Sequence, residues 1–222
     1  MTAEPGGTEE KTSTNTAPFT GVVLAGGRSR RLGRNKALEE VGGVPLLSRV
    51  TTVVESIASG LVLVVADEAQ ADVLPAPDDA ITVLDVHPDS GSLGGIFTGL
   101  TEAPTDWALV VACDMPFLNV QLLTHMAGSR EGADIVIPVL DGWPEPTHAF
   151  YSKTCLPPMK ESLNNGRLKI TDFFDSVTVK YLPQESIEAI DPERWSFFNV
   201  NTAVDLEKAR ARDADLVAGL AT

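Results

Sequence analysis

Residues 19–36 read FTGVVLAGGRSRRLGRNK, and the segment changes from apolar to basic at a pair of glycines. Residues 19–24 form a short apolar run rich in β-branched side chains, which is typical of a buried strand. The five basic residues that follow lie within nine positions and have no acid among them; they are Arg28, Arg30, Arg31, Arg34 and Lys36. Glycines at positions 26, 27 and 33 let backbone N–H groups approach an anion closely. The segment therefore predicts a strand followed by a loop that binds a polyphosphate.

This basic loop matches neither of two common phosphate-binding motifs. A P-loop requires G-x-x-x-x-G-K-[ST], whereas Lys36 lies three residues after Gly33 and is followed by Ala37. The spacing of the glycines also differs from G-x-G-x-x-G. An exposed arginine-rich surface turn is the alternative interpretation, but it explains neither the strand before the loop nor the glycine pair.

The size and composition of the chain indicate one folded domain behind a short tail. The chain has 222 residues, of which 43% are hydrophobic and 22% are charged, as in ordinary globular domains. Residues 1–18 contain no Leu, Ile, Val or aromatic side chain, so we expect a disordered tail there. We expect residues 19–222 to form a single domain.

Charge, hydropathy and cysteine content exclude several protein classes. Seventeen basic residues against 31 acidic ones give a net charge of -14, which argues against non-specific nucleic-acid binding. The chain has no apolar stretch long enough to span a membrane, and its N-terminus lacks the features of a secretory signal, so we expect a cytoplasmic protein. Cys113 and Cys155 do not form a C-x-x-C pattern, so we expect buried thiols rather than a disulfide or a structural zinc site.

Short apolar runs alternate with segments of helical periodicity along the rest of the chain. The expected strands are residues 19–24, 61–66, 81–84, 107–112, 134–139 and 147–151. The expected helices are residues 45–59, one within 67–74, 96–103, 119–128 and 205–220, the last with Thr202 as N-cap and Asp205 three residues later. Continuous apolar strands that alternate with helices predict an α/β fold: a three-layer, Rossmann-like, mostly parallel sheet with helices on both faces.

Three acids lie where expected strands end, namely Asp67, Asp85 and Asp114. Ligands of open parallel sheets bind outside the carboxyl ends of the strands, so we expect the function there. Asp114 follows the most apolar run, and Pro116 keeps that strand from continuing. A carboxylate in this place can hold Mg²⁺, which prefers one or two carboxylates together with substrate phosphate oxygens. The alternative is that Asp114 caps the helix that begins near residue 119.

At this point the chain resembles a known family. The segment LAGGRSRRLGRNKALEEVGGVPLL is similar to the opening signature of the sugar-nucleotidyltransferase superfamily, and more narrowly to that of the molybdenum cofactor guanylyltransferases. The resemblance covers residues 19–206, and its other anchors are SGSLGGIFTGL, ALVVACDMPFL, EPTHAFYS and FFNVNTAVDLE. It implies the nucleotide-diphospho-sugar transferase type of fold. It also implies transfer of GMP from GTP to molybdopterin, which gives molybdopterin guanine dinucleotide and pyrophosphate.

The resemblance implies roles for particular residues. Those expected to bind the nucleotide are Leu24, Ala25, Gly26, Gly27, Lys36, Asp85, Gly94 and Asp114. Asp114 is the expected Mg²⁺ ligand, and it acts in catalysis together with Lys36 and Arg31. His148, Asn199 and Asn201 are expected on the acceptor side.

Several of these residues have a structural alternative. Asp85 can be a solvated turn residue, and the SGSLGG segment, which resembles the G-P-L-A-G of the family, can serve only to start a helix. A lone His148 without a second ligand at metal spacing is more often structural. Asn199 and Asn201 can form only the turn before the last helix. Asp67 lies where related enzymes often carry an Asn for the base, which leaves that contact open.

The implied reaction is an in-line attack of an acceptor phosphate on the α-phosphorus of GTP. The phosphate is already a nucleophile, so catalysis reduces to positioning and to charge neutralisation by Mg²⁺, Lys36 and the arginine cluster. Alternatives are a molybdopterin cytidylyltransferase, another small-molecule nucleotidyltransferase of this superfamily, or a non-catalytic nucleotide-binding regulator. The expected ligands are GTP and molybdopterin. Proteins that insert the cofactor, and molybdoenzymes, are candidate partners, with the Trp143 loop as one candidate docking place.

Overall fold

The computed structural model describes residues 17–26 and 35–219. Gly27 and the arginines at 28, 30, 31 and 34 lie outside the described residues, as does nearly all of the expected tail. The nucleotide and catalytic roles of Gly27 and Arg31 therefore stay predictions.

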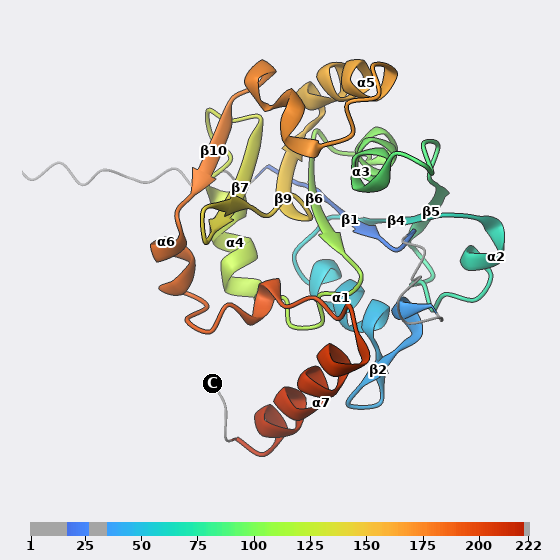
Figure 1. The fold of residues 1–222 in the computed structure, drawn as a ribbon, viewed down its shortest axis with the longest axis vertical. Coiled ribbons are helices and arrows are strands. Elements are labelled where there is room, and N and C mark those ends of the chain that lie inside the picture. The colour runs from blue at the N-terminus through green and yellow to red at the C-terminus, as the bar shows by residue number, and fades with distance from the viewer. Residues whose placement is uncertain (1–16, 27–34, 220–222) are drawn as a thin grey trace, which may run out of the picture.

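An eight-stranded sheet forms the centre of the molecule, with the strand order β10-β7-β9-β6-β1-β4-β5 and with β8 paired to β7 (Figure 1). The strands are β1 (Thr20–Leu24), β4 (Leu61–Val65), β5 (Ile81–Leu84), β6 (Trp107–Ala112), β7 (Ile135–Leu140), β8 (Trp143–Pro144), β9 (His148–Ser152) and β10 (Val179–Leu182). Strand β1 pairs in parallel with β4 and β6, whereas β9 runs antiparallel to both β6 and β7. The expectation of a mostly parallel sheet is confirmed. Its antiparallel members are β9 and the two-residue β8, which pairs with β7.

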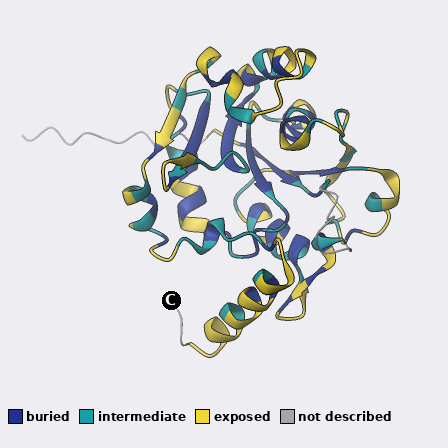
Figure 2. Ribbon diagram, in the orientation of Figure 1, coloured by how far each residue is buried: buried dark blue, intermediate teal, exposed yellow. Residues whose placement is uncertain are grey.

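Helices cover both faces of this sheet. The longer ones are α1 (Leu46–Glu55), α3 (Gly91–Glu102), α4 (Val120–Gly128), α5 (Leu156–Asn164) and α7 (Ala203–Val217); α2 (Glu68–Ala71) and α6 (Gln184–Glu188) are short. Residues of α1 and α4 share one apolar core with one face of the sheet, and residues of α3 and α5 share a second core with the other face. Neighbouring side chains of β1 divide between these cores, Val23 in the first and Val22 in the second, as strand geometry requires. The inner strands are accordingly buried, whereas the edge strands β5 and β10 and the outer helix faces are partly exposed (Figure 2).

The structure corrects the expected start of α3. The glycines at 94 and 95 suggested a turn before a helix at residue 96, but the helix begins at Gly91. The glycines of α3 permit close packing instead: a Cβ on Gly99 would overlap the side chain of Val22, and one on Gly94 would overlap the backbone of His87. Glycine weakens a helix, but it is tolerated at position 99 because α3 and β1 approach too closely there for a side chain.

Two other predictions are confirmed, one for the start of the last helix and one for the two cysteines. Helix α7 begins at Ala203, and its N-terminus has the expected capping box between Thr202 and Asp205. Cys113 and Cys155 are free and buried, and burial raises the pKa of each thiol to about 12. Within the described part of the chain, none of the helices combines the length and the apolar character that crossing a membrane requires.

Candidate active site

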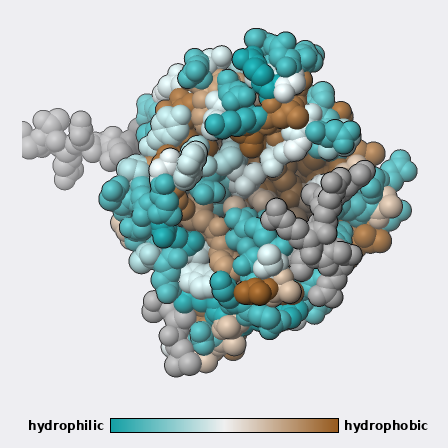
Figure 3. Space-filling model, viewed as in Figure 1, coloured by the Kyte–Doolittle hydropathy of each residue, from teal (hydrophilic) through white to brown (hydrophobic). Residues whose placement is uncertain are grey.

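Two adjoining cavities lie at the carboxyl ends of β1, β4, β5 and β6. The nucleotide-side cavity has a volume of about 410 Å³; its lining is Leu24, Gly26, Val64, Ala66, Asp85, Pro88, Asp89, Gly91, Ser92 and Gly95. The central cavity has a volume of about 210 Å³; its lining is Leu24, Ala25, Asn35, Lys36, Ala37, Ser92, Ala112, Cys113, Asp114 and Thr147. Leu24 and Ser92 line both, so the two cavities meet at the end of β1. The space-filling view shows apolar surface gathered in the middle of this face between hydrophilic rims (Figure 3).

Lys36, Asp114 and Asn201 meet beside the central cavity. The ammonium Nζ of Lys36 lies 2.7 Å from Oδ1 of Asn201 and 3.3 Å from Oδ2 of Asp114, and donates to both. Only 17% of each of the Lys36 and Asp114 side chains is exposed. Burial raises the pKa of the Asp114 carboxyl, and the nearby Lys36 ammonium opposes that rise. The three residues are far apart in sequence, so the fold alone brings a cation, a carboxylate and an amide together.

The surrounding backbone holds each member of this cluster. Asn35 caps the short 3₁₀ helix Lys36–Leu38 by accepting from the N–H of Ala37 at 3.2 Å. The N–H of Val200 donates to the carbonyl of Asp114 at 2.9 Å, which joins the end of β6 to the segment before α7. The helix cap near residue 119 is Asn119 itself, whose side chain accepts from the N–H groups of residues 121 and 122. The alternative role of Asp114 as that cap is therefore wrong.

The capping box of α7 fixes the backbone of Asn201. Oδ2 of Asp205 accepts from the N–H of Asn201 at 3.2 Å and from that of Thr202 at 2.9 Å. These bonds leave the Asn201 side chain free to reach Lys36. Asn199 differs, because its side chain donates to the carbonyl of Phe197 at 3.0 Å and stabilises the turn. The side chain of Asn199 thus stabilises the turn and that of Asn201 contacts Lys36, and the acceptor contact of either stays a prediction.

Asp85 has the turn role and also lines the nucleotide-side cavity, while its contact with the nucleotide stays a prediction. Its Oδ1 accepts from the N–H of His87 at 2.8 Å and from Oγ1 of Thr98 at 3.1 Å, which is the turn role. The same residue lines the nucleotide-side cavity, and its Oδ2 lies 3.9 Å from the position that a Cβ on Gly95 would take. Gly95 lines this cavity, whereas Gly94 is buried against His87. The carboxylate therefore has one oxygen held by the fold and one directed to the cavity wall.

Gln70 is a functional candidate that the sequence analysis missed. Its side-chain amide donates to the carbonyl of Ala25 and accepts from the N–H of Ala66, both at 2.8 Å. Asp67 caps α2 by accepting from the N–H of Gln70 at 2.9 Å, so this acid has a structural role. Gln70 thus joins the ends of β1 and β4 directly before the basic loop. The spacing of an Asp followed three residues later by a Gln resembles a capping box and was the signal available.

His148 lies in the core rather than in a cavity. Its ring is fully buried and packs against Phe197 with 4.4 Å between ring centroids, and neither ring nitrogen has a hydrogen bond among the described residues. Burial lowers its pKa to about 3, an effect that the nearby Ser196 backbone opposes in part, so the ring is neutral at physiological pH. Its neighbour Thr147 lines the central cavity instead. A contact of His148 with the acceptor stays a prediction without support from its position.

The donor set around Asp114 fits an ion that is shared with a substrate. No group of three or more His, Cys, Asp or Glu side chains arranged for a metal occurs in residues 17–26 and 35–219. Asp114 contributes one partly buried carboxylate beside the central cavity. Mg²⁺ is commonly bound by one or two carboxylates plus phosphate oxygens, so a nucleotide in these cavities would complete such a site.

Comparison with known proteins connects this geometry to one family. A sequence profile of the MobA-like NTP transferase domain matches residues 21–177. The "Probable molybdenum cofactor guanylyltransferase" of Pelotomaculum thermopropionicum is 39% identical over 191 residues, which cover 86% of this chain and 91% of that protein. The "Molybdenum cofactor guanylyltransferase" of Desulfosudis oleivorans is 36% identical over 194 residues, with coverage of 86% and 94%. The crystal structure of molybdopterin-guanine dinucleotide biosynthesis protein A from Archaeoglobus fulgidus has a TM-score of 0.78 at 32% identity, and the match covers 89% of this chain and 100% of that one.

Proposed function

Because the chain belongs to the family of MobA-like NTP transferase domains, we propose that it transfers GMP from GTP to molybdopterin and releases pyrophosphate. The observation that carries this proposal is the cluster of Lys36, Asp114 and Asn201 beside the central cavity. The two relatives named guanylyltransferases each match 86% of the chain.

Guanine recognition is assigned to the nucleotide-side cavity. Guanine presents an N1–H and an amino group side by side, and a carboxylate accepts from such a pair. Cytosine presents its one amino group beside a ring nitrogen that is a hydrogen-bond acceptor. The lone pair of that nitrogen and a carboxylate oxygen repel each other. Asp85 is one of two acids that line this cavity, and it is held in place through Oδ1, which supports GTP as the nucleotide. A cytidylyltransferase is the second candidate, because the cavity also has the volume for the smaller base.

Mg²⁺ dependence is part of the proposal. Asp114 would hold the ion together with phosphate oxygens of the nucleotide. When bound, Mg²⁺ would supply charge neutralisation for the triphosphate and for the departing pyrophosphate.

Lys36 supplies positive charge from the protein itself. Among the described residues that line the two cavities, Lys36 is the sole cation. Asn201 holds its ammonium at the cavity wall through a hydrogen bond of 2.7 Å, so little reorganisation is required when a phosphate arrives. Arg31 is proposed as a second cation for the triphosphate. The acceptor phosphate is ionised near neutral pH and attacks without a general base, which agrees with the burial of His148 away from both cavities.

The proposal places the protein in the cytoplasm, where GTP is supplied. Its net charge of -14 argues against nucleic acid as a partner. Proteins that insert the finished cofactor, and the molybdoenzymes that receive it, are the partners that the proposed product would require.

Pyrophosphate release tests this function. The purified protein is supplied with Mg²⁺, molybdenum-loaded molybdopterin and one of GTP, CTP, ATP or UTP. We expect release with GTP that depends on both the acceptor and Mg²⁺, and that stops when EDTA is added. Release with CTP alone would replace the guanylyl assignment by the cytidylyl one, and no release with any nucleotide would contradict the proposed function.

A further inference from the structure

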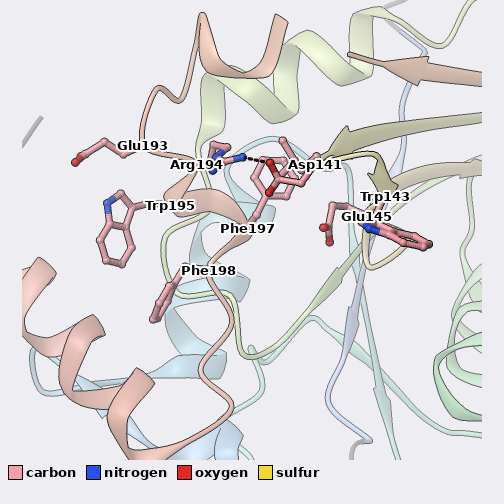
Figure 4. Close-up of a pocket in the computed structure, with 9 residues that line it drawn as sticks. Asp141, Trp143, Glu145, Glu193, Arg194, Trp195, Phe197 and Phe198 are labelled. Atoms are coloured by element: carbon pink, nitrogen blue, oxygen red, sulfur yellow. Dashed lines mark hydrogen bonds and ion pairs between the residues drawn. The ribbon is translucent and has the colours of Figure 1, made fainter. Parts of the chain in front are cut away.

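Two more cavities lie on either side of the hairpin formed by β7 and β8. The first, here the Arg194 cavity, has a volume of about 600 Å³; its lining is Leu140, Asp141, Trp143, Glu145, Glu193, Arg194, Trp195, Phe197 and Phe198. Figure 4 shows Trp195 and Phe198 on one side of it, and Trp143 with Glu145 on the other. The second, here the Lys169 cavity, has a volume of about 530 Å³ and is lined by Ser92, residues 142–144, Pro146 and residues 168–171.

The two cavities have opposite charge. Three carboxylates line the Arg194 cavity. The Arg194 guanidinium is already paired, with Asp141 at 3.1 Å and with Glu188 at 3.8 Å. Lys169 is the only charged side chain among the described residues of the other cavity, and no ion pair links it to any other described residue. In a chain with a net charge of -14, the Lys169 cavity is therefore a local site of positive charge.

The Lys169 cavity is also the one that adjoins the active site. Ser92 lines it together with the central and the nucleotide-side cavities. The Arg194 cavity shares no described lining residue with the central cavity. A molecule whose phosphate lies beside Lys36 can thus extend past Ser92 into the Lys169 cavity.

The wall of the Lys169 cavity offers a flat apolar surface. The Trp143 side chain is 71% exposed, and Leu168 is 42% exposed. The exposed Trp143 and Leu168 side chains line the same cavity, and together they form an apolar surface that a flat ligand can cover. Indole faces stack on planar heteroaromatic rings, and Pro144 and Pro146 make the wall rigid.

We propose that the Lys169 cavity holds the pterin end of the acceptor, with Trp143 as its stacking surface and Lys169 as its charge partner. This inference rests on the proposed function, since that function supplies an acceptor with a flat pterin and a phosphate. The acceptor is anionic, so the three carboxylates of the Arg194 cavity disfavour it there.

A matched pair of variants tests this assignment. Lys169→Gln and Arg194→Gln each remove one positive charge from one of the two cavities. Binding of molybdopterin is measured without nucleotide, by quenching of tryptophan fluorescence in anaerobic buffer, and the KM values for molybdopterin and GTP are measured separately. We expect Lys169→Gln to raise the Kd and the KM for molybdopterin about fivefold, with a weaker dependence on salt, and to leave the KM for GTP unchanged. Arg194→Gln is expected to leave all three values unchanged.

A second pair tests the apolar walls. Leu168→Ala is expected to weaken molybdopterin binding, whereas Phe198→Ala is expected to leave it unchanged in a protein whose melting temperature confirms folding. Trp143→Phe keeps an aromatic face, so we expect binding to persist while most of the quenching disappears.

The outcomes separate this inference from the function on which it rests. Weaker binding in Arg194→Gln or Phe198→Ala, with normal binding in the Lys169 and Leu168 variants, would assign the acceptor to the Arg194 cavity and overturn the inference. Normal binding in all four variants would overturn it as well. If the unmodified protein transfers no GMP and binds no molybdopterin, the proposed function itself fails.

Discussion

The carboxyl ends of β1, β4, β5 and β6 differ from the hairpin region around β7 and β8 in the chemistry that they display. The first region gathers polar groups, and the Lys36 ammonium there donates hydrogen bonds to both Asp114 and Asn201. The second presents an exposed indole, prolines and a lysine that forms no ion pair with another described residue. The difference indicates a division of labour, in which the strand ends perform the reaction and the hairpin selects the acceptor. Variants in the first region should therefore lower kcat, and variants in the second should raise an acceptor KM.

The largest effect is expected at Asp114. Replacement by Asn preserves the shape of the side chain but removes the charge that would hold Mg²⁺. We expect kcat to fall about 10³-fold, without recovery at high Mg²⁺ concentration, in an assay of pyrophosphate release. The matched change Asp85→Asn should affect the KM for GTP more than kcat. A near-normal kcat in Asp114→Asn would break the division between the two regions.

Lys36 and Asn201 should show the next largest losses of kcat. Lys36→Ala is expected to lower kcat about 10²-fold while GTP binding weakens much less, because its charge is required most as pyrophosphate departs. Asn201→Ala should lower kcat about 10-fold, since the ammonium then loses its 2.7 Å hydrogen bond. Asn199→Ala is the control, because among the described residues the Asn199 side chain bonds the turn carbonyl of Phe197 and not Lys36. Equal losses in the two asparagine variants would contradict a specific role of Asn201.

Gln70 should have a smaller effect that is confined to the nucleotide. Gln70→Ala removes the amide that joins Ala25 to Ala66, so we expect the KM for GTP to rise about fivefold, with the acceptor KM unchanged. Gln184→Ala is a matched control, because Gln184 likewise holds a backbone N–H, that of Asp141, but does so in the hairpin region. Both variants lose a glutamine amide that accepts from a backbone N–H. The KM values for GTP and for the acceptor, measured in steady state, therefore compare the two regions directly. A rise in the acceptor KM of Gln70→Ala would contradict the division.

His148 should affect stability and not catalysis. The unfolded chain binds a proton at this ring below a pKa of about 6.5, but the folded chain does so only near 3, so the free energy of unfolding should decline as the pH falls from 6.5 toward 3. In His148→Phe this decline should be smaller, while kcat and stability at pH 7.5 stay near those of the unmodified protein. Urea unfolding at pH 7.5 and pH 5 measures the difference. If the free energy of unfolding of His148→Phe declines with pH as steeply as that of the unmodified protein, His148 does not cause the decline.

The two regions also differ in how much the sequence predicts. Asp85 and Asp114 follow continuous apolar strands, so their place at the carboxyl ends follows from local patterns and from the rule for parallel sheets. The contact between Lys36 and Asn201 joins positions 165 residues apart, and no local pattern encodes its geometry. In the hairpin region, β8 has only two residues, and the short 3₁₀ segment Ile170–Ser176 lies later in the chain. Such elements are too short for a periodic signal, so the Lys169 cavity becomes visible only in three dimensions.

Transfer of the α-phosphate tests the central claim most directly. The protein is incubated with Mg²⁺ and molybdopterin, and with GTP labelled either at the α-phosphate or at the γ-phosphate. The proposed reaction moves the α-label to the acceptor and leaves the γ-label in pyrophosphate. No α-label on molybdopterin, or transfer of the γ-label in its place, would contradict guanylyl transfer at the Lys36–Asp114 site.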